Sequence, residues 1–372
     1  MRILIVMIIC LPSFLLAQSP EVVKVYNLGV AAAQKKQYQQ AIKHYNEALL
    51  MDPLYPKAYY NRANAKLSLK DYSEAAKDFG RCLKLEPDNG KAHYYKAYCN
   101  MQLNENENAL KSFTQAIKYD PGLSKAYYYR GFIQMKAGKY EVAVNDFLEA
   151  SKKDPDNERL FYNLGLCYNK LERTEDAFLA FEKALSINSE FKPTLLELIR
   201  LDYKEGQYDE CLRLGQQAID KDSEDKVVLY YVAMSALKLN KLEMSGQYFD
   251  QLIALDPEHE TALKNKAVVS IRLKDYESAA ADYGRLISFD TENPTYYLNR
   301  AISYMQLKNW RAALFDLSTC IALDAENGEA YYNRATVNFQ LEEFEKACED
   351  IRTSAKLDYE QAFNYVASLC QN

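Results

Sequence analysis

Pairs of a basic residue and a tyrosine, three positions apart, recur along the first half of the chain. On a helix this spacing places the two side chains next to each other on one face. A phenol offers flat apolar area and a hydroxyl, and a neighbouring cation pairs with a carboxylate. These pairs predict non-covalent binding of an extended protein segment, with acidic segments favoured. The alternative is that tyrosine merely fills its position and the cations solvate a helix face. The four pairs are Lys57 with Tyr60, Lys91 with Tyr94, Lys125 with Tyr128, and Arg159 with Tyr162.

Residue types that support catalysis or metal binding form no motif in this sequence. The chain has three histidines, and they do not cluster with one another. There is no phosphate-binding glycine-rich loop, no nucleophile motif and no C-x-x-C pair. An enzyme is the main rival to a binding protein, and we expect no enzymatic activity, no cofactor and no metal.

The elements that position the basic–tyrosine pairs repeat with a period of 34 residues. Pro53, Pro87, Pro121 and Pro155 follow this interval, and ten in-phase units fill residues 22–361 without insertion or deletion. Each unit contains two apolar-periodic stretches of about a dozen residues, which is typical of two amphipathic helices. Short polar turns separate the stretches, and proline stops the second one. The sequence therefore predicts an all-α repeat array.

The residues at recurring positions resemble those of the tetratricopeptide repeat family. The resemblance covers residues 22–361 and implies a right-handed superhelical solenoid of ten helix-turn-helix units. It also implies that residues 362–372 form a C-terminal capping helix. The fifth unit carries the signature most fully, with Leu164, Gly165, Tyr168, Ala177, Phe181 and Ala184.

In this family the first helices of the units line a concave surface, and the second and fifth positions face inward. The resemblance therefore implies that the eight residues of the basic–tyrosine pairs lie in a concave groove. The family's best-known clamp for chaperone tails requires other residues at these positions. The chain departs from that clamp at Tyr26, Val30 and Tyr95, so we do not expect this ligand.

Two positions of the repeat vary together, which predicts a salt bridge between the helices of one unit. Units that have arginine at the seventh position have aspartate at the twenty-third, and units with Leu or Val there lack the acid. Lys266 with Asp282 follows the rule, whereas Lys96 with Ser112 breaks it. An unpaired charge at a packed position is costly, so both partners are kept or lost together. The arginine pairs are Arg62 with Asp78, Arg130 with Asp146, Arg300 with Asp316, and Arg334 with Asp350.

Departures from the repeat cluster in residues 189–225, where we expect an irregular stretch. Serine replaces the usual proline at Ser189 and Ser223, and Gly215 replaces a second-helix aromatic residue. The charge changes at the same place: residues 18–189 carry 25 basic and 21 acidic residues, and residues 190–372 carry 20 and 31. The resulting net charges of +4 and −11 allow head-to-tail self-association.

Residues 1–17 are typical of a secretory signal peptide. Arg2 precedes an apolar stretch that ends at the small residue Ala17, and the stretch is too short to span a bilayer comfortably. An uncleaved anchor and a lipoprotein with Cys10 at its cleavage site are the alternatives. We therefore expect an exported chain that is periplasmic, envelope-associated or secreted, with no membrane span after cleavage.

Seven cysteines, an odd number, remain after cleavage behind Ala17. Most of them occupy positions where other units place small residues, which predicts buried helix contacts. In an oxidising compartment a disulfide such as Cys82–Cys99 stays open as an alternative.

These features together favour a non-enzymatic scaffold that binds extended protein segments in its concave groove. The alternative within the same class is a structural component of an envelope-associated multiprotein assembly. Aromatic residues next to cations can also stack nucleic-acid bases, but the acidic total of the chain and its expected export argue against nucleic acid. The expected partners are therefore other proteins or peptides.

Overall fold

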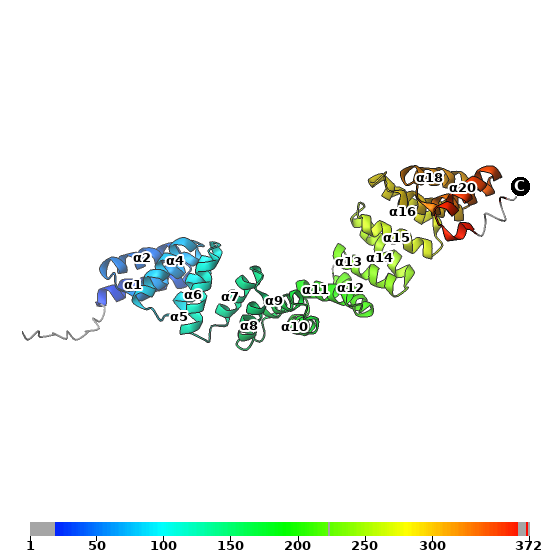
Figure 1. Ribbon diagram of the computed structural model, residues 1–372. Helices are drawn as coiled ribbons and strands as arrows, with labels where there is room; N and C mark the ends of the chain where they lie inside the picture. The colour runs from blue at the N-terminus through cyan, green and yellow to red at the C-terminus, as the bar shows by residue number, and fades with distance from the viewer. Residues whose placement is uncertain (1–18, 222–223, 364–369, 371–372) are drawn as a thin grey trace, which may run out of the picture. The chain divides into compact units, whose positions relative to one another are not determined.

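The computed structural model describes residues 19–221, 224–363 and 370, and these residues form twenty α-helices (Figure 1). The chain divides into two compact parts, an N-terminal half of residues 1–191 and a C-terminal half of residues 192–372. The division falls between the fifth and sixth 34-residue repeats. The predicted signal peptide, residues 1–17, lies outside the described residues.

Each half contains five helix pairs. The odd-numbered helix of a pair is the first helix of its repeat and packs against the even-numbered second helix. The N-terminal half contains α1 (Pro20–Gln34), α2 (Tyr38–Met51), α3 (Pro56–Ser68), α4 (Tyr72–Leu85), α5 (Gly90–Gln102), α6 (Asn106–Tyr119), α7 (Ser124–Lys136), α8 (Tyr140–Ser151), α9 (Glu158–Lys170) and α10 (Thr174–Ile187). The C-terminal half contains α11 (Lys192–Lys204), α12 (Tyr208–Lys221), α13 (Lys226–Lys238), α14 (Leu242–Leu255), α15 (Glu260–Arg272), α16 (Tyr276–Phe289), α17 (Pro294–Gln306), α18 (Trp310–Leu323), α19 (Gly328–Gln340) and α20 (Phe344–Lys356). The predicted all-α array of helix-turn-helix repeats is confirmed.

The turn between the two helices of a repeat has the same backbone conformation in all ten repeats. The residue at the fifteenth position of the repeat adopts a positive φ, for example 60° at Lys36 and 75° at Gly138. The following amide closes the turn, as Gln37 donates to the carbonyl of Ala32 at 2.9 Å. This left-handed residue ends the first helix and reverses the chain. Glycine occupies the position only twice, so the other eight repeats accept a strained turn residue.

Aromatic residues of the second helices form the centre of the N-terminal half. They occupy the twenty-fourth position, and each is at most 1% exposed. These residues are Tyr45, Phe79, Phe113, Phe147 and Phe181. In the sixth repeat this position is Gly215, and a Cβ atom there would lie 2.1 Å from Cγ2 of Val232. A valine from the next repeat thus fills the space that an aromatic ring fills elsewhere.

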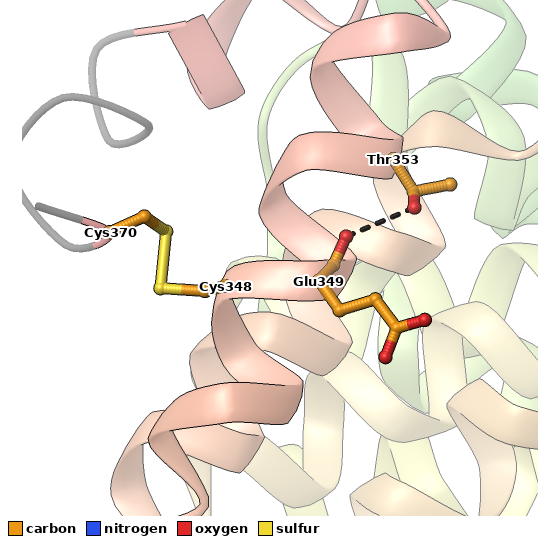
Figure 2. The surroundings of a disulfide bond; sticks show 4 residues. All are labelled: Cys348, Glu349, Thr353 and Cys370. Carbon is orange, nitrogen blue, oxygen red and sulfur yellow. Dashed lines mark hydrogen bonds between the residues drawn. A yellow bond between two sulfur atoms is a disulfide. The ribbon is translucent and has the colours of Figure 1, made fainter. Parts of the chain in front are cut away.

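The C-terminal end of the chain is joined to its last helix pair by a disulfide between Cys348 on α20 and Cys370 (Figure 2). The sequence left the pairing of its cysteines open. The predicted capping helix, residues 362–372, lies mostly outside the described residues, and residues 360–363 are helical.

The five remaining described cysteines are buried and free, including Cys82 and Cys99. Burial raises the pKa of the Cys82 thiol to about 11 and that of Cys99 to about 12. Since the thiolate is the reactive form, we expect these five thiols to resist iodoacetamide in the native protein at pH 8 and to react after unfolding. Peptide mapping by mass spectrometry checks this, and stoichiometric labelling of a native thiol among the five would contradict it. Without reductant, Cys348 and Cys370 should not label in either state.

Candidate protein-binding site

The first helices of neighbouring repeats approach one another within each half, as α7 does α9 and α13 does α15. They form a surface that we call the first-helix face. Lys57, Lys91, Lys125 and Arg159 lie here, each in the first turn of its helix and each exposed. No ion pair joins any of them to another described residue. Cations at helix N-termini oppose the helix dipole, so helix stability does not explain this row.

The tyrosines of the four pairs are less accessible than the cations. Tyr60, Tyr128 and Tyr162 are half-buried, and Tyr94 is only 9% exposed. Each ring packs against the second-helix aromatic residue of its own repeat, with ring centres 5.6–6.2 Å apart. Burial raises the pKa of Tyr60 to about 12. These tyrosines are therefore partly core residues, and Tyr94→Ala would remove packing rather than test binding alone.

Contacts along the first-helix face run from one repeat to the next. The hydroxyl of Tyr128 accepts a hydrogen bond from Nδ2 of Asn163 at 3.1 Å. Burial raises the pKa of Tyr128, and the charge of Arg159 acts in the opposite direction. Arg159 thus acts electrostatically on the tyrosine of the preceding repeat as well as standing beside Tyr162 in its own helix. Ring contacts join Tyr60 to Tyr94 through Tyr95, and Tyr94 to Tyr128 through Tyr129. The tyrosines of the four pairs therefore form a connected strip.

The first-helix face of the C-terminal half contains two clefts that the sequence analysis did not single out. One cleft of about 350 Å³ lies between α13 and α15 and is lined by Tyr230 and His259, whose rings stack with centres 6.0 Å apart. A second cleft of about 340 Å³ lies between α15 and α17 and is lined by Lys264 and Tyr296. Tyr230 stands at the same repeat position as Tyr60, so the recurring tyrosine was the available signal.

The four covarying arginine–aspartate pairs lie within hydrogen-bonding distance. In each pair the arginine donates through two nitrogens to both carboxylate oxygens, with distances of 2.6–3.0 Å. The hydrogen bond to Asp146 raises the pKa of Arg130. The aspartate side chains are 1–7% exposed, so each pair is a partly buried contact between the two helices of one repeat.

The expected pair of Lys266 with Asp282 is wrong. Lys266 instead pairs with Asp250, which lies on the second helix of the preceding repeat. Oδ2 of Asp282 has no hydrogen-bond partner, and burial raises the pKa of this carboxyl to about 6. Lysine has one ammonium group, whereas arginine has a fork of nitrogens that binds both oxygens of a carboxylate. In this repeat the single ammonium group binds the acid of the neighbouring repeat.

Within the described residues, no group of three or more His, Cys, Asp or Glu is placed to hold a metal ion. Over the same part of the chain, none of the helices is long and apolar enough to cross a membrane.

Models of the tetratricopeptide repeat match most of the chain. The matched segments are residues 26–55, 56–89, 90–123, 133–193, 233–294 and 298–358. The chain belongs to the tetratricopeptide repeat family. This family consists of repeat scaffolds that bind proteins and peptides and are generally non-catalytic. Residues 194–232, between two matched segments, cover much of the stretch where the repeat departs from its own pattern.

Several solved tetratricopeptide repeat structures are similar to this chain. YrrB, described as having an unusual peptide-binding site, is 24% identical over 47% of this chain and 90% of its own, with a TM-score of 0.44. A repeat protein from Parabacteroides merdae is 18% identical over 67% of this chain and 99% of its own, with a TM-score of 0.43. MamA from Desulfovibrio magneticus is 20% identical over 47% of this chain and 99% of its own, with a TM-score of 0.44. No curated protein matches the chain significantly.

Proposed function

We propose that this chain is a non-enzymatic scaffold, exported from the cytoplasm, that binds extended acidic protein segments along the first-helix face of its N-terminal half. The observation that carries the proposal is the row of four exposed cations, Lys57, Lys91, Lys125 and Arg159, without ion-pair partners among the described residues. Their placement at helix N-termini is unfavourable for the helices themselves, so a bound anion would relieve it.

The half-buried tyrosines supply the other part of the proposed site. Their rings are held in place by packing against Phe79, Phe147 and Phe181. A rigid aromatic edge binds an extended chain with little loss of side-chain entropy, and the adjacent cations select acidic side chains. The family's generally non-catalytic character supports binding without catalysis.

Charge reversal at two central cations tests the proposal. In Lys91→Glu/Lys125→Glu, we expect affinity for a fluorescent peptide of alternating Leu and Glu to fall at least about tenfold at low salt, because attraction becomes repulsion. Fluorescence anisotropy at two salt concentrations measures this.

The matched control is Lys43→Glu/Lys183→Glu, which makes the same charge change on exposed lysines of second helices. An equal loss in the control would show a general charge effect and contradict the proposed site. Pull-down from intact cells then separates two roles: many transient clients support the binding scaffold, and one large stable complex supports a structural component of an assembly.

A further inference from the structure

The residue at the seventh position of a repeat lies between two possible acceptors. One is the twenty-third residue of its own repeat, and the other is the twenty-fifth residue of the preceding repeat. Arg62 binds Asp78 on one side and donates from Nη1 to Oδ1 of Asn46 at 2.7 Å on the other. Arg130 likewise binds Asp146 and reaches Thr114 at 3.2 Å. Among the described residues, Arg300 and Arg334 form an ion pair only with their own aspartate, and Gly284 stands at the second acceptor's position beside Arg300. The aspartate of the cation's own repeat is therefore the acceptor that all four arginines share.

The third repeat keeps the cation and lacks both acceptors. Lys96 stands at the seventh position, with Ser112 in place of the aspartate and Gly80 in place of the second acceptor. A Cβ atom on Gly80 would lie 3.9 Å from Nζ of Lys96, so the missing side chain leaves open space beside the ammonium group. No hydrogen bond or ion pair joins the Lys96 side chain to another described residue.

A second donor next to Lys96 is also left without an acceptor. Asn100, at the eleventh position, is 5% exposed and makes no side-chain hydrogen bond within the described part of the chain. The residue at this position binds the aspartate in other repeats: Lys66 lies 2.7 Å from Asp78, and Asn338 donates to Asp350 at 3.0 Å. The third repeat thus retains both donors of a carboxylate site and lacks the carboxylate. A carboxylate from a ligand would supply the acceptor that these two donors lack.

These donors open into a large groove, which we call the repeat-3 groove. It has a volume of about 1220 Å³, lies along α2, α4 and α6, and is lined by Gly80, Lys96, Asn100 and Ser112. Arg81, Lys84 and Lys111 also line it, and none has an ion pair with a described residue. Of its three acids, Asp78 binds Arg62, Glu74 binds Lys77, and Glu105 has no ion pair with a described residue. Seven lysines and arginines line the groove against these three acids. The groove therefore has an excess of positive charge that attracts anions.

We propose that the repeat-3 groove binds an acidic protein segment, one of whose carboxylates takes the place of the missing aspartate between Lys96 and Asn100. A carboxylate is the group that the second, fourth, ninth and tenth repeats place at this position. The groove holds several residues rather than a single ion, and its surrounding cations pair with further acidic side chains. None of the four cations of the first-helix face lines it, so this is a second surface, distinct from the proposed binding face.

Two variants that supply an internal carboxylate test the groove. Ser112→Asp recreates the pair of the second and fourth repeats, and Gly80→Asp places an acid where Asp250 binds Lys266. Both are made in a background with Lys57, Lys91, Lys125 and Arg159 changed to Gln, which removes the cations of the first-helix face. We expect labelled octaglutamate to bind this background, and each variant to weaken binding at least about tenfold because the site is already occupied. Ser186→Asp on α10 makes the same charge change outside the groove and should alter affinity less than about twofold.

Thermal melting checks that each variant is folded. If Ser112→Asp does not fold, Gly80→Asp alone decides the test. The proposal is overturned if octaglutamate does not bind the background, or if neither groove variant weakens it more than Ser186→Asp does. Inorganic phosphate and a mixed oligonucleotide are tested in parallel. If either one binds more tightly than octaglutamate and this binding is lost in the same two variants, the groove is assigned to phosphate groups and the carboxylate assignment is overturned. Because the background lacks the first-helix cations, failure here leaves the proposed function untouched.

Discussion

Asp316→Ala is expected to lower the free energy of unfolding by about 3 kcal/mol, because it leaves the Arg300 guanidinium without its carboxylate in a packed interface. Asp316 is 1% exposed, and Nε and Nη2 of Arg300 each lie 2.8 Å from one of its oxygens. The side chain of Arg300 is 19% exposed, so water relieves part of the loss. Urea denaturation followed by circular dichroism measures the change.

The internal copies of the repeat suggest the compensating change. Repeat five has Leu164 at the seventh position and Ala180 at the twenty-third. Arg300→Leu combined with Asp316→Ala copies that pair, and we expect the double variant to be more stable than Asp316→Ala by at least about 1 kcal/mol. If the changes in unfolding free energy of Arg300→Leu and Asp316→Ala simply add up to that of the double variant, the coupling that the covariation predicts is contradicted.

Gly215→Ala is expected to cost about 2 kcal/mol by overpacking the second helix of the sixth repeat. The added methyl group would lie 2.1 Å from Cγ2 of Val232, and both residues are buried. Neither helix can yield without moving its neighbours, since interiors are packed to crystal-like density. Thermal melting of the single variant checks the direction and size of the effect.

Two further variants distinguish overpacking at Gly215 from the general effect of replacing a helical glycine by alanine. Val232→Ala together with Gly215→Ala should recover much of the loss, because it removes the clashing methyl groups. Gly246→Ala on α14 is the matched control: its nearest neighbour would be Cγ1 of Val269 at 3.6 Å, an ordinary contact. There we expect a gain of up to about 1 kcal/mol from helix propensity. A stabilised Gly215→Ala would show that Val232 does not fill the position as described.

The repeat explains why so much of the fold could be predicted from the sequence. Ten copies at a fixed period reveal the helix pairs, and the joint variation of the seventh and twenty-third positions points to their contacts. The left-handed turn residue was harder to see, because Lys, Asn and Glu occupy it in eight repeats and only its position shows the constraint. The disulfide between Cys348 and Cys370 depends on which two cysteines lie together in space, which no spacing in the sequence encodes.

Contacts between neighbouring repeats account for what the sequence analysis missed. Lys266 on α15 pairs with Asp250 on α14 of the preceding repeat and not with Asp282 on α16 of its own repeat, a choice that the positions of the residues in the repeat do not reveal. The sequence marks Lys96 with Ser112 as an exception, but the meaning of Gly80 appears only when the seventh position is seen beside the twenty-fifth of the preceding repeat. A tyrosine at this repeat position can be half-buried, as Tyr60 is, or almost fully buried, as Tyr94 is. The recurrence of tyrosine therefore does not predict how far each side chain is buried.

The central claim is that protein segments bind along the cations of the first-helix face, and carbodiimide cross-linking tests it most directly. This reagent joins a carboxylate to an amine only when the two are in contact. Captured clients should be coupled to Lys57, Lys91 and Lys125, and coupling at these three lysines should fall when Arg159→Glu is introduced beside them. Coupling confined to second-helix lysines such as Lys43 and Lys183 would contradict the account.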